Sequence, residues 1–114
     1  MKLKKITKKQ LRNEAKKLRS RRLITISAQV IGNENHLFYH FDDNKEVISL
    51  ELVFPKSENH VDSIIKIFPN ANIFERELHD LFGIEFDGNP NMDHHLFLAD
   101  EWKEGPPRRD EKNA

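Results

Sequence analysis

Three consecutive segments of the sequence, residues 24–30, 36–41 and 47–54, alternate between apolar and polar side chains. A period of two residues is typical of a β-strand that buries one face. Turn-forming residues separate the segments at positions 32–35 and 42–45, and Pro55 ends the third by removing a backbone donor. Two short turns among three strands predict a three-stranded antiparallel meander.

A cationic helix is predicted ahead of the meander, over about residues 7–20. Thr7 and Gln10 form a capping-box pair at its start. One apolar stripe follows at the spacing i, i+4 and i+7, formed by Leu11, Ala15 and Leu18. Capping and stripe together favour a helix that docks on its own domain.

Two further helices are predicted after the meander. The first would carry a narrow apolar stripe made of Val61, Ile64, Ile65 and Phe68. Ser57 or Asn59 can cap its start, and Pro69 stops it. The second would cover Glu75 to Phe82, with Gly83 as its C-cap.

The predicted fold class is α+β, in the order N-terminal helix, antiparallel meander, helix, short strand and helix, and extended C-terminal tail. A chain of 114 residues is long enough for one domain. We place that domain at residues 1–88. From Glu85 onward no period holds and Gly, Pro, Asp and Asn are frequent, so residues 89–114 are predicted to be an extended docking tail with one or two short strands.

The sequence contains no cysteine. This excludes disulfides, thiolate-bound zinc, cysteine-ligated iron–sulfur clusters and a cysteine nucleophile. No stretch approaches the roughly 20 apolar residues that span a bilayer, and the basic N-terminus lacks the apolar segment of a secretory signal. We therefore expect a cytoplasmic protein that reaches a membrane only through a partner.

The net charge of zero conceals a strong asymmetry along the chain. Residues 1–22 carry a net charge of +10, and residues 23–114 carry −10. A basic arm on an acidic body suggests an electrostatic interaction surface. The alternative to a docked helix is an arm that binds nucleic acid or anionic lipid through Lys8, Lys9, Arg12, Lys16 and Lys17.

The densest charged cluster is the run from residue 75 to residue 80. Glu75 and Glu77 could in principle serve as general acid and base, but two residues apart on a helix they point in different directions. The pairs that meet at i, i+4 are Glu75 with His79 and Arg76 with Asp80. We interpret these as pairs that support the helix, and we predict no catalytic residue here.

A second cluster, Asp93-His94-His95 with Asp87 and Asp100 nearby, contains zinc or iron ligand types. Adjacent histidines on an extended chain point to opposite sides, so ordinary polar loop residues are favoured. A small metal-dependent hydrolase using His79, His94 and His95 stays open as an alternative. The four glycines are isolated, so no phosphate-binding loop is predicted.

The stretch from Ile67 to Pro90 closely resembles the signature of the C-subunit family of NADH:quinone oxidoreductase (respiratory complex I). That family includes the equivalent subunit of membrane-bound, energy-converting nickel–iron hydrogenases. The signature is roughly E-R-E-x-x-D-x-F-G-I-x-F-x-G-H-P, then a hydrophobic strand, D-x-W and P-L-R-K-D. The matching positions are Glu75, Arg76, Glu77, Asp80, Phe82, Gly83, Ile84, Phe86, Gly88 and Pro90, then Leu96, Leu98, Asp100, Trp102, Pro106, Arg108 and Asp110.

The sequence departs from this pattern at several positions. Asn89 stands where the signature has histidine, and Pro107 and Arg109 stand where it has Leu and Lys. Partner-specific differences are expected at Asn89 and at His94-His95.

The resemblance implies a non-catalytic subunit that binds no cofactor itself. In such complexes it packs beside the large subunit, which houses the quinone site or its nickel–iron counterpart, and near the small cluster-bearing subunit. The implied cofactors, 4Fe–4S clusters with nickel–iron or quinone, belong to those partners. The implied docking residues are Glu75, Arg76, Glu77, Asp80, Phe82, Gly83, Phe86, Gly88 and Pro90, with a strip formed by Trp102, Pro106, Arg108, Arg109 and Asp110.

Similarity favours the hydrogenase branch, or a related archaeal or anaerobic ion-pumping complex, over respiratory complex I. The chain ends soon after Arg108-Arg109-Asp110, and residues 103–107 look closer to that branch. Either branch implies a peripheral position on the cytoplasmic side of the cell membrane, with no nucleic-acid partner.

Overall fold

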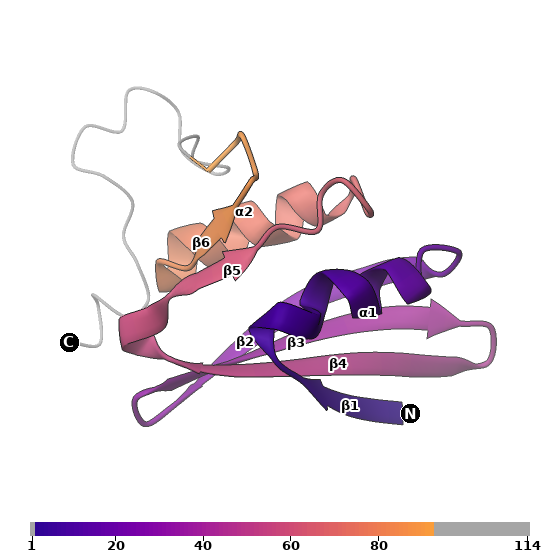
Figure 1. The fold of residues 1–114 in the computed structure, drawn as a ribbon, viewed down its shortest axis with the longest axis horizontal. Coiled ribbons are helices and arrows are strands. Elements are labelled where there is room, and N and C mark those ends of the chain that lie inside the picture. Colours follow the sequence, from indigo (N-terminus) through magenta and orange to yellow (C-terminus); the bar gives the residue numbers. More distant parts are fainter. Residues whose placement is uncertain (1, 93–114) are drawn as a thin grey trace.

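The computed structural model describes residues 2–92. In chain order the elements are β1 (Lys2–Ile6), the 3-10 turn η1 (Lys8–Gln10), α1 (Leu11–Lys17), β2 (Arg22–Ile31), β3 (Glu34–Asp43), β4 (Glu46–Pro55), the 3-10 turn η2 (Lys56–Glu58), β5 (His60–Asp62), α2 (Ala71–Phe82) and β6 (Glu85–Asp87). Figure 1 shows this arrangement. The mixed α+β character is confirmed, but the order of elements differs from the prediction.

The antiparallel meander of β2, β3 and β4 is confirmed. Tyr39 in the middle of β3 lies between Ile26 of β2 and Leu50 of β4. Both turns use a residue with positive φ, Gly32 at 60° and Asn44 at 61°. Glycine and asparagine tolerate this left-handed conformation, which explains why the turns fall where the sequence predicts them.

β1 is a strand that the sequence analysis missed. It pairs with β4 in parallel, from Lys2 opposite Ile48 to Ile6 opposite Leu52, so the sheet order is β1-β4-β3-β2. Its sequence, KLKKI, has three lysines and no regular alternation. The strand depends on tertiary contacts, because Ile6 is buried in the core and Lys4 pairs with a carboxylate on the next helix.

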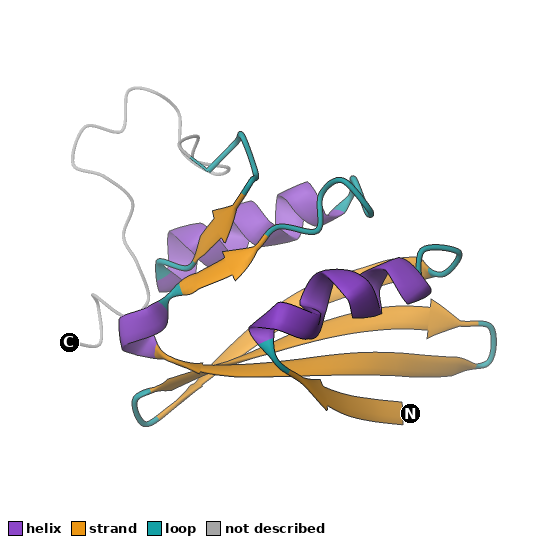
Figure 2. Ribbon diagram, viewed as in Figure 1, coloured by secondary structure: helices purple, strands orange, loops and turns teal. Residues whose placement is uncertain are grey.

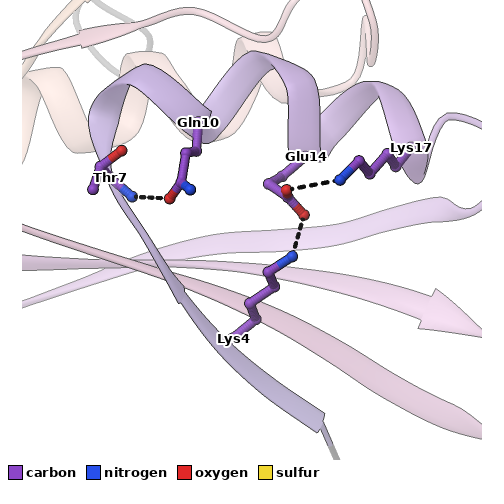
Figure 3. Close-up of polar contacts among 5 residues, drawn as sticks. All are labelled: Lys4, Thr7, Gln10, Glu14 and Lys17. Atoms are coloured by element: carbon purple, nitrogen blue, oxygen red, sulfur yellow. Dashed lines mark hydrogen bonds and ion pairs between the residues drawn. The ribbon is translucent and has the colours of Figure 1, made fainter.

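The basic helix is confirmed but shorter than predicted. A 3-10 turn at residues 8–10 leads into α1, which ends at Lys17. The Thr7 amide donates to Gln10 Oε1 at 2.9 Å, as a capping box requires (Figure 3). Leu11 and Ala15 are fully buried.

The helix predicted through residues 61–68 is wrong. Residues 60–62 instead form β5, which pairs in parallel with β6, His60 opposite Glu85. Val61, Ile64 and Phe68 are buried as expected, but a strand followed by a turn buries them. The spacing of these residues predicted correctly that they are buried but predicted the wrong secondary structure. An apolar run this short does not distinguish a helix from a strand.

The predicted caps of that helix have other roles. Ser57 lies in η2. The Asn59 side chain accepts from Asn35 at 2.7 Å and donates to the Phe82 carbonyl at 3.3 Å.

α2 contains the predicted helix of residues 75–82 and begins one turn earlier, at Ala71. Gly83 is the predicted C-cap: its φ is 70°, and its amide donates to the His79 carbonyl at 2.9 Å.

Both helices lie on the same face of the four-stranded sheet, and β5 and β6 lie on that side as well (Figure 2). The core fills the space between the layers, where β3 contributes Leu37, Tyr39 and Phe41. Within residues 2–92, no helix covers the opposite face of the sheet (Figure 2). Packing continues past Gly88, the predicted end of the domain, because Asn89 and Met92 are buried.

Candidate functional site

The centre of the candidate site is Glu75, in the second turn of α2. Its side chain is 0% exposed and accepts three hydrogen bonds. Ser63 Oγ donates at 2.6 Å, the Ile64 amide at 3.0 Å and Asn89 Nδ2 at 2.9 Å. A buried carboxylate needs such donors to offset its lost hydration. Glu75 thus fastens α2 both to the segment that follows β5 and to the segment that follows β6.

Three asparagines extend this arrangement toward the surface. Asn89 Nδ2 also lies 3.3 Å from Asn72 Oδ1, which accepts from Asn91 Nδ2 at 3.1 Å. Asn89 Oδ1 accepts from the Asn91 amide at 2.8 Å. Asn89 is only 7% exposed and is bonded inside the domain, to Glu75. The expectation of partner-specific differences at residue 89 stays a prediction.

Burial shifts the acidity of two groups at this site. It raises the pKa of Glu75, and the hydrogen bonds from Ser63, Ile64 and Asn89 oppose that shift in part. Burial, and then the charges of Glu75 and Asp62, hold the pKa of Tyr39 well above its usual range. Within residues 2–92, the Tyr39 hydroxyl is buried without a hydrogen-bond partner.

The predicted pair of Glu75 with His79 is wrong. Glu75 points into the core, whereas His79 Nδ1 lies 2.9 Å from the Ile84 carbonyl and 3.8 Å from the Glu85 carboxylate. Residues four apart are neighbours on a helix, but here Ser63, Ile64 and Asn89 occupy the Glu75 carboxylate, and His79 bonds to the segment that follows the helix. The pairing of Arg76 with Asp80 stays a prediction.

The structure separates the signature residues into two groups. Glu75, Asp80, Ile84 and Phe86 are buried and contribute to the packing of the domain. Those that reach the surface at least in part are Arg76, Glu77, Phe82, Gly83, Gly88 and Pro90. The exposed face of α2 also carries Ile73, which is 55% exposed. The predicted strip of Trp102, Pro106, Arg108, Arg109 and Asp110 lies outside the described residues, as do His94 and His95.

Sequence reasoning missed the roles of Ser63, Tyr39 and Asn89. The only signal was that Asn89 departs from the signature. No local sequence pattern identifies Ser63 or Tyr39, because both are distant from Glu75 in the sequence and only the fold relates them to it.

Within residues 2–92, no group of His, Asp and Glu side chains could hold a metal ion. The hydrolase alternative needs His94 and His95, so it is not tested there. In the same part of the chain, no helix is both long and apolar enough to cross a membrane.

Much of the positive charge of the basic arm is paired within the domain. Glu14 Oε1 lies 2.8 Å from Lys4 Nζ, and Glu14 Oε2 lies 3.1 Å from Lys17 Nζ (Figure 3). Arg12 lies 3.8 Å from Asp62, and Lys2 lies 3.6 Å from Glu46. Two of the five cations proposed to contact nucleic acid, Arg12 and Lys17, therefore already have acidic partners.

Together, the fold and the site define a class: a small α+β domain in which a buried carboxylate anchors one helix, whose other face is at least partly exposed within residues 2–92. Two solved structures share the fold. One is Nqo5 in its trypsin-resistant fragment (1–134), with a TM-score of 0.68 and 18% identity over 77% of this chain and 80% of that one. The other comes from a membrane-bound sulfane sulfur reductase, an archaeal respiratory membrane complex, with a TM-score of 0.75 and 22% identity over 93% of this chain and 68% of that one.

The sequence model of the respiratory-chain NADH dehydrogenase 30 kDa subunit matches residues 4–114. The chain belongs to this family, which confirms the resemblance inferred from the signature. The C/D subunit of NADH-quinone oxidoreductase from Shigella flexneri serotype 5b (strain 8401) is 42% identical over 77 residues. That alignment covers 65% of this chain but only 13% of the relative.

Proposed function

We propose that the chain is a non-catalytic subunit of a membrane-bound, ion-translocating redox complex. The observation that carries this proposal is family membership across residues 4–114, which includes the whole signature. An energy-converting nickel–iron hydrogenase is the favoured complex. The alternative is the C subunit of a respiratory complex that transfers electrons from NADH, or a related donor, to quinone.

The internal anchoring of α2 supports a docking role. Because Glu75 ties this helix to two other segments, the outer face of the helix is held rigid before any partner arrives. We place the large subunit, with its quinone or nickel–iron site, against this face and against the strip from Trp102 to Asp110. Aromatic and arginine side chains such as those in the strip are enriched at protein interfaces.

In this proposal the cofactors reside in the partners, as 4Fe–4S clusters with nickel–iron or quinone. The absence of cysteine from the sequence agrees with this, since the chain has no thiolate to ligate a cluster. The chain would sit peripherally on the cytoplasmic side of the membrane, attached through other subunits.

The test is purification of the full chain with a C-terminal tag from membranes solubilised in mild detergent. We expect a large assembly that contains iron, with nickel for the hydrogenase branch or NADH:quinone reductase activity without nickel for the other. Replacing Trp102, Arg108 and Arg109 together with Ala should release the chain from the assembly. The control Lys45→Ala, in the turn before β4, should leave it bound.

A tagged chain that is recovered alone, with no iron-containing partner, would overturn the proposal. So would release of the Lys45→Ala chain to the same extent as the triple variant, because the strip would then have no specific role.

A further inference from the structure

The edge of the sheet is incomplete beside the end of β4. β1 pairs with β4 only from Ile48 to Leu52, whereas β4 continues to Pro55. Val53, Phe54 and Pro55 therefore have no neighbouring strand on that side within residues 2–92. An unpaired strand edge presents backbone donors and acceptors that another extended chain can use. Pro55 contributes no N–H and sets the end of this edge.

An open groove of about 510 Å³ lies at this position. Its apolar residues are Ile6, Val53, Phe54 and Pro55, and Val53 is 37% exposed. Lys5, at the end of β1, and Lys9, in η1, contribute two of its cations. An open strand edge, apolar side chains and cations thus occur together at one place.

The groove is lined by three lysines, Lys5, Lys8 and Lys9, and by two acids, Glu51 and Glu58, so the cations outnumber the carboxylates by one. Lys8 is held by the Phe54 ring, 4.6 Å from its centroid, and donates to the Glu58 carbonyl. Glu51 is engaged by His36 Nδ1 at 3.2 Å. Within residues 2–92, Lys5 and Lys9 are exposed and form no ion pair. Within residues 2–92, the two groove lysines without an ion pair, Lys5 and Lys9, therefore outnumber the one groove carboxylate without an ion pair, Glu58.

We infer that this groove binds an extended acidic segment of a partner protein, which adds to the sheet beside Val53–Pro55. Carboxylates of the segment would meet Lys5 and Lys9, and its alternate apolar side chains would contact Val53. Addition of an extended peptide to a sheet edge gains main-chain hydrogen bonds from the edge and selectivity from the flanking side chains. This contact is separate from the proposed docking of α2 and the tail, and it does not depend on which redox complex is involved.

Other occupants fit the site less well. A second copy of the chain would bring its own lysine-rich β1 against this one, and lysines on an edge strand oppose such pairing. Nucleic acid would use the cations of the arm, but Arg12 and Lys17 are paired with acids. Neither nucleic acid nor a lipid surface would use an unpaired strand edge with apolar side chains.

The test uses the full chain and a fluorescein-labelled octapeptide that alternates Glu and Val, followed by fluorescence anisotropy at low salt. A second peptide, with Pro at its two central positions, keeps most of the charge but cannot form a strand. We expect the second peptide to bind at least tenfold more weakly. The double variant Lys5→Gln with Lys9→Gln should weaken binding of the first peptide at least fivefold.

The matched control is Lys16→Gln with Arg19→Gln, which removes two exposed cations elsewhere on the arm and should change binding less than twofold. A thermal melt of each variant checks that the fold is retained. Val53→Glu, which adds a carboxylate beside the edge, gives an independent variant and should also abolish binding.

Equal binding of both peptides would overturn strand addition and leave only charge attraction. No binding at all would mean that the lysines serve only to keep the edge from pairing. A 20-base-pair RNA duplex or anionic vesicles that displace the peptide and depend on Lys5 and Lys9 would assign the site to a different ligand. A dimer that depends on these lysines would assign it to a second copy.

Discussion

The carboxylate of Glu75 is fully buried, and it accepts hydrogen bonds from donors in two other segments of the chain. The Ile64 amide is one of these donors, so part of the backbone depends on this side chain. Removing one partner from a buried hydrogen bond leaves the other unsatisfied, which costs more than the bond itself contributes. Glu75 is therefore the residue on which the packing of α2 depends most.

Glu75→Ala should lower the free energy of unfolding by about 3 kcal/mol, because it leaves several buried donors without an acceptor. Glu75→Gln keeps the shape and one acceptor oxygen and should lose roughly half as much. Urea unfolding of the full chain measures both. The control Glu77→Ala, on the partly exposed face of α2, should stay within about 0.5 kcal/mol of wild type. A loss for Glu75→Ala no larger than for Glu77→Ala would contradict the anchoring role.

The same variants report on protonation. Burial raises the pKa of Glu75 in the folded state above the ordinary value of 4.5. At a pH between 4.5 and the folded pKa, Glu75 is therefore protonated in the folded state but ionised in the unfolded state. Stability from this group therefore rises as pH falls toward 4.5 and is lost as pH rises through the folded pKa. Relative to Glu75→Gln, wild type should gain stability as pH falls from about 7 to about 5. A pH-independent difference would exclude this shift.

For single residues, the sequence identified Glu75 as important but not its role. The family signature includes Glu75, and the helical spacing predicted that it pairs with His79. Spacing along one helix cannot show which face turns inward, because the rest of the chain decides that. Ser63 and Asn89 come from segments before and after the helix, so only the fold brings them to Glu75.

Among the elements, α2 ends where its sequence requires. Gly83 adopts φ of 70°, a conformation that costs a residue with a Cβ atom about 1–2 kcal/mol. Gly83→Ala should destabilise the chain by that amount and lower the melting temperature. Gly83→Asn should lose clearly less, since asparagine tolerates the left-handed conformation. Equal losses for Ala and Asn would indicate that contacts, rather than backbone conformation, set the requirement for glycine.

Elements were predictable where the local pattern and the tertiary environment agree. β2, β3 and β4 each present one face to the core and are joined by short turns, so alternation and turn residues located them. β1 and β5 are short, and each pairs in parallel with a strand that is distant in the sequence. No local sequence pattern predicts such a strand. The apolar spacing of residues 61–68 matched a helix because strand-plus-turn geometry can bury the same positions.

For the molecule as a whole, the sequence divides into a basic arm and an acidic body, and folding brings the two together. Glu14 is the acid within the arm, and it accepts from Lys4 of β1 and Lys17 of α1 (Figure 3). Those hydrogen bonds hold the pKa of Glu14 below its ordinary value of 4.5. One carboxylate therefore connects the first strand to the helix that covers the sheet.

Glu14→Gln should cost roughly 1 kcal/mol at pH 7, the upper range for exposed ion pairs, and less at high salt. Because the folded pKa is depressed, the contribution is present above pH 4.5 and is lost as pH falls through the folded pKa. Wild type and variant should therefore converge in acid. The measurement is chemical unfolding at pH 7 and below pH 4, with Glu58→Gln as the control. A difference that persists in acid would point to packing instead of charge.

The parallel pairing of β1 with β4 has a consequence for the order in which the protein is assembled during translation. β1 is synthesised before the meander, yet its partners, Ile48 to Leu52, emerge only with the last strand of the meander, β4. The hairpins can close locally, whereas β1 must wait, because contacts distant in sequence form late. Its lysines then help to keep a nascent strand that carries Leu3 and Ile6 from pairing with other chains. The segment that carries Asn89 is made later still, so the anchor at Glu75 is completed only after β1 and the meander have been made.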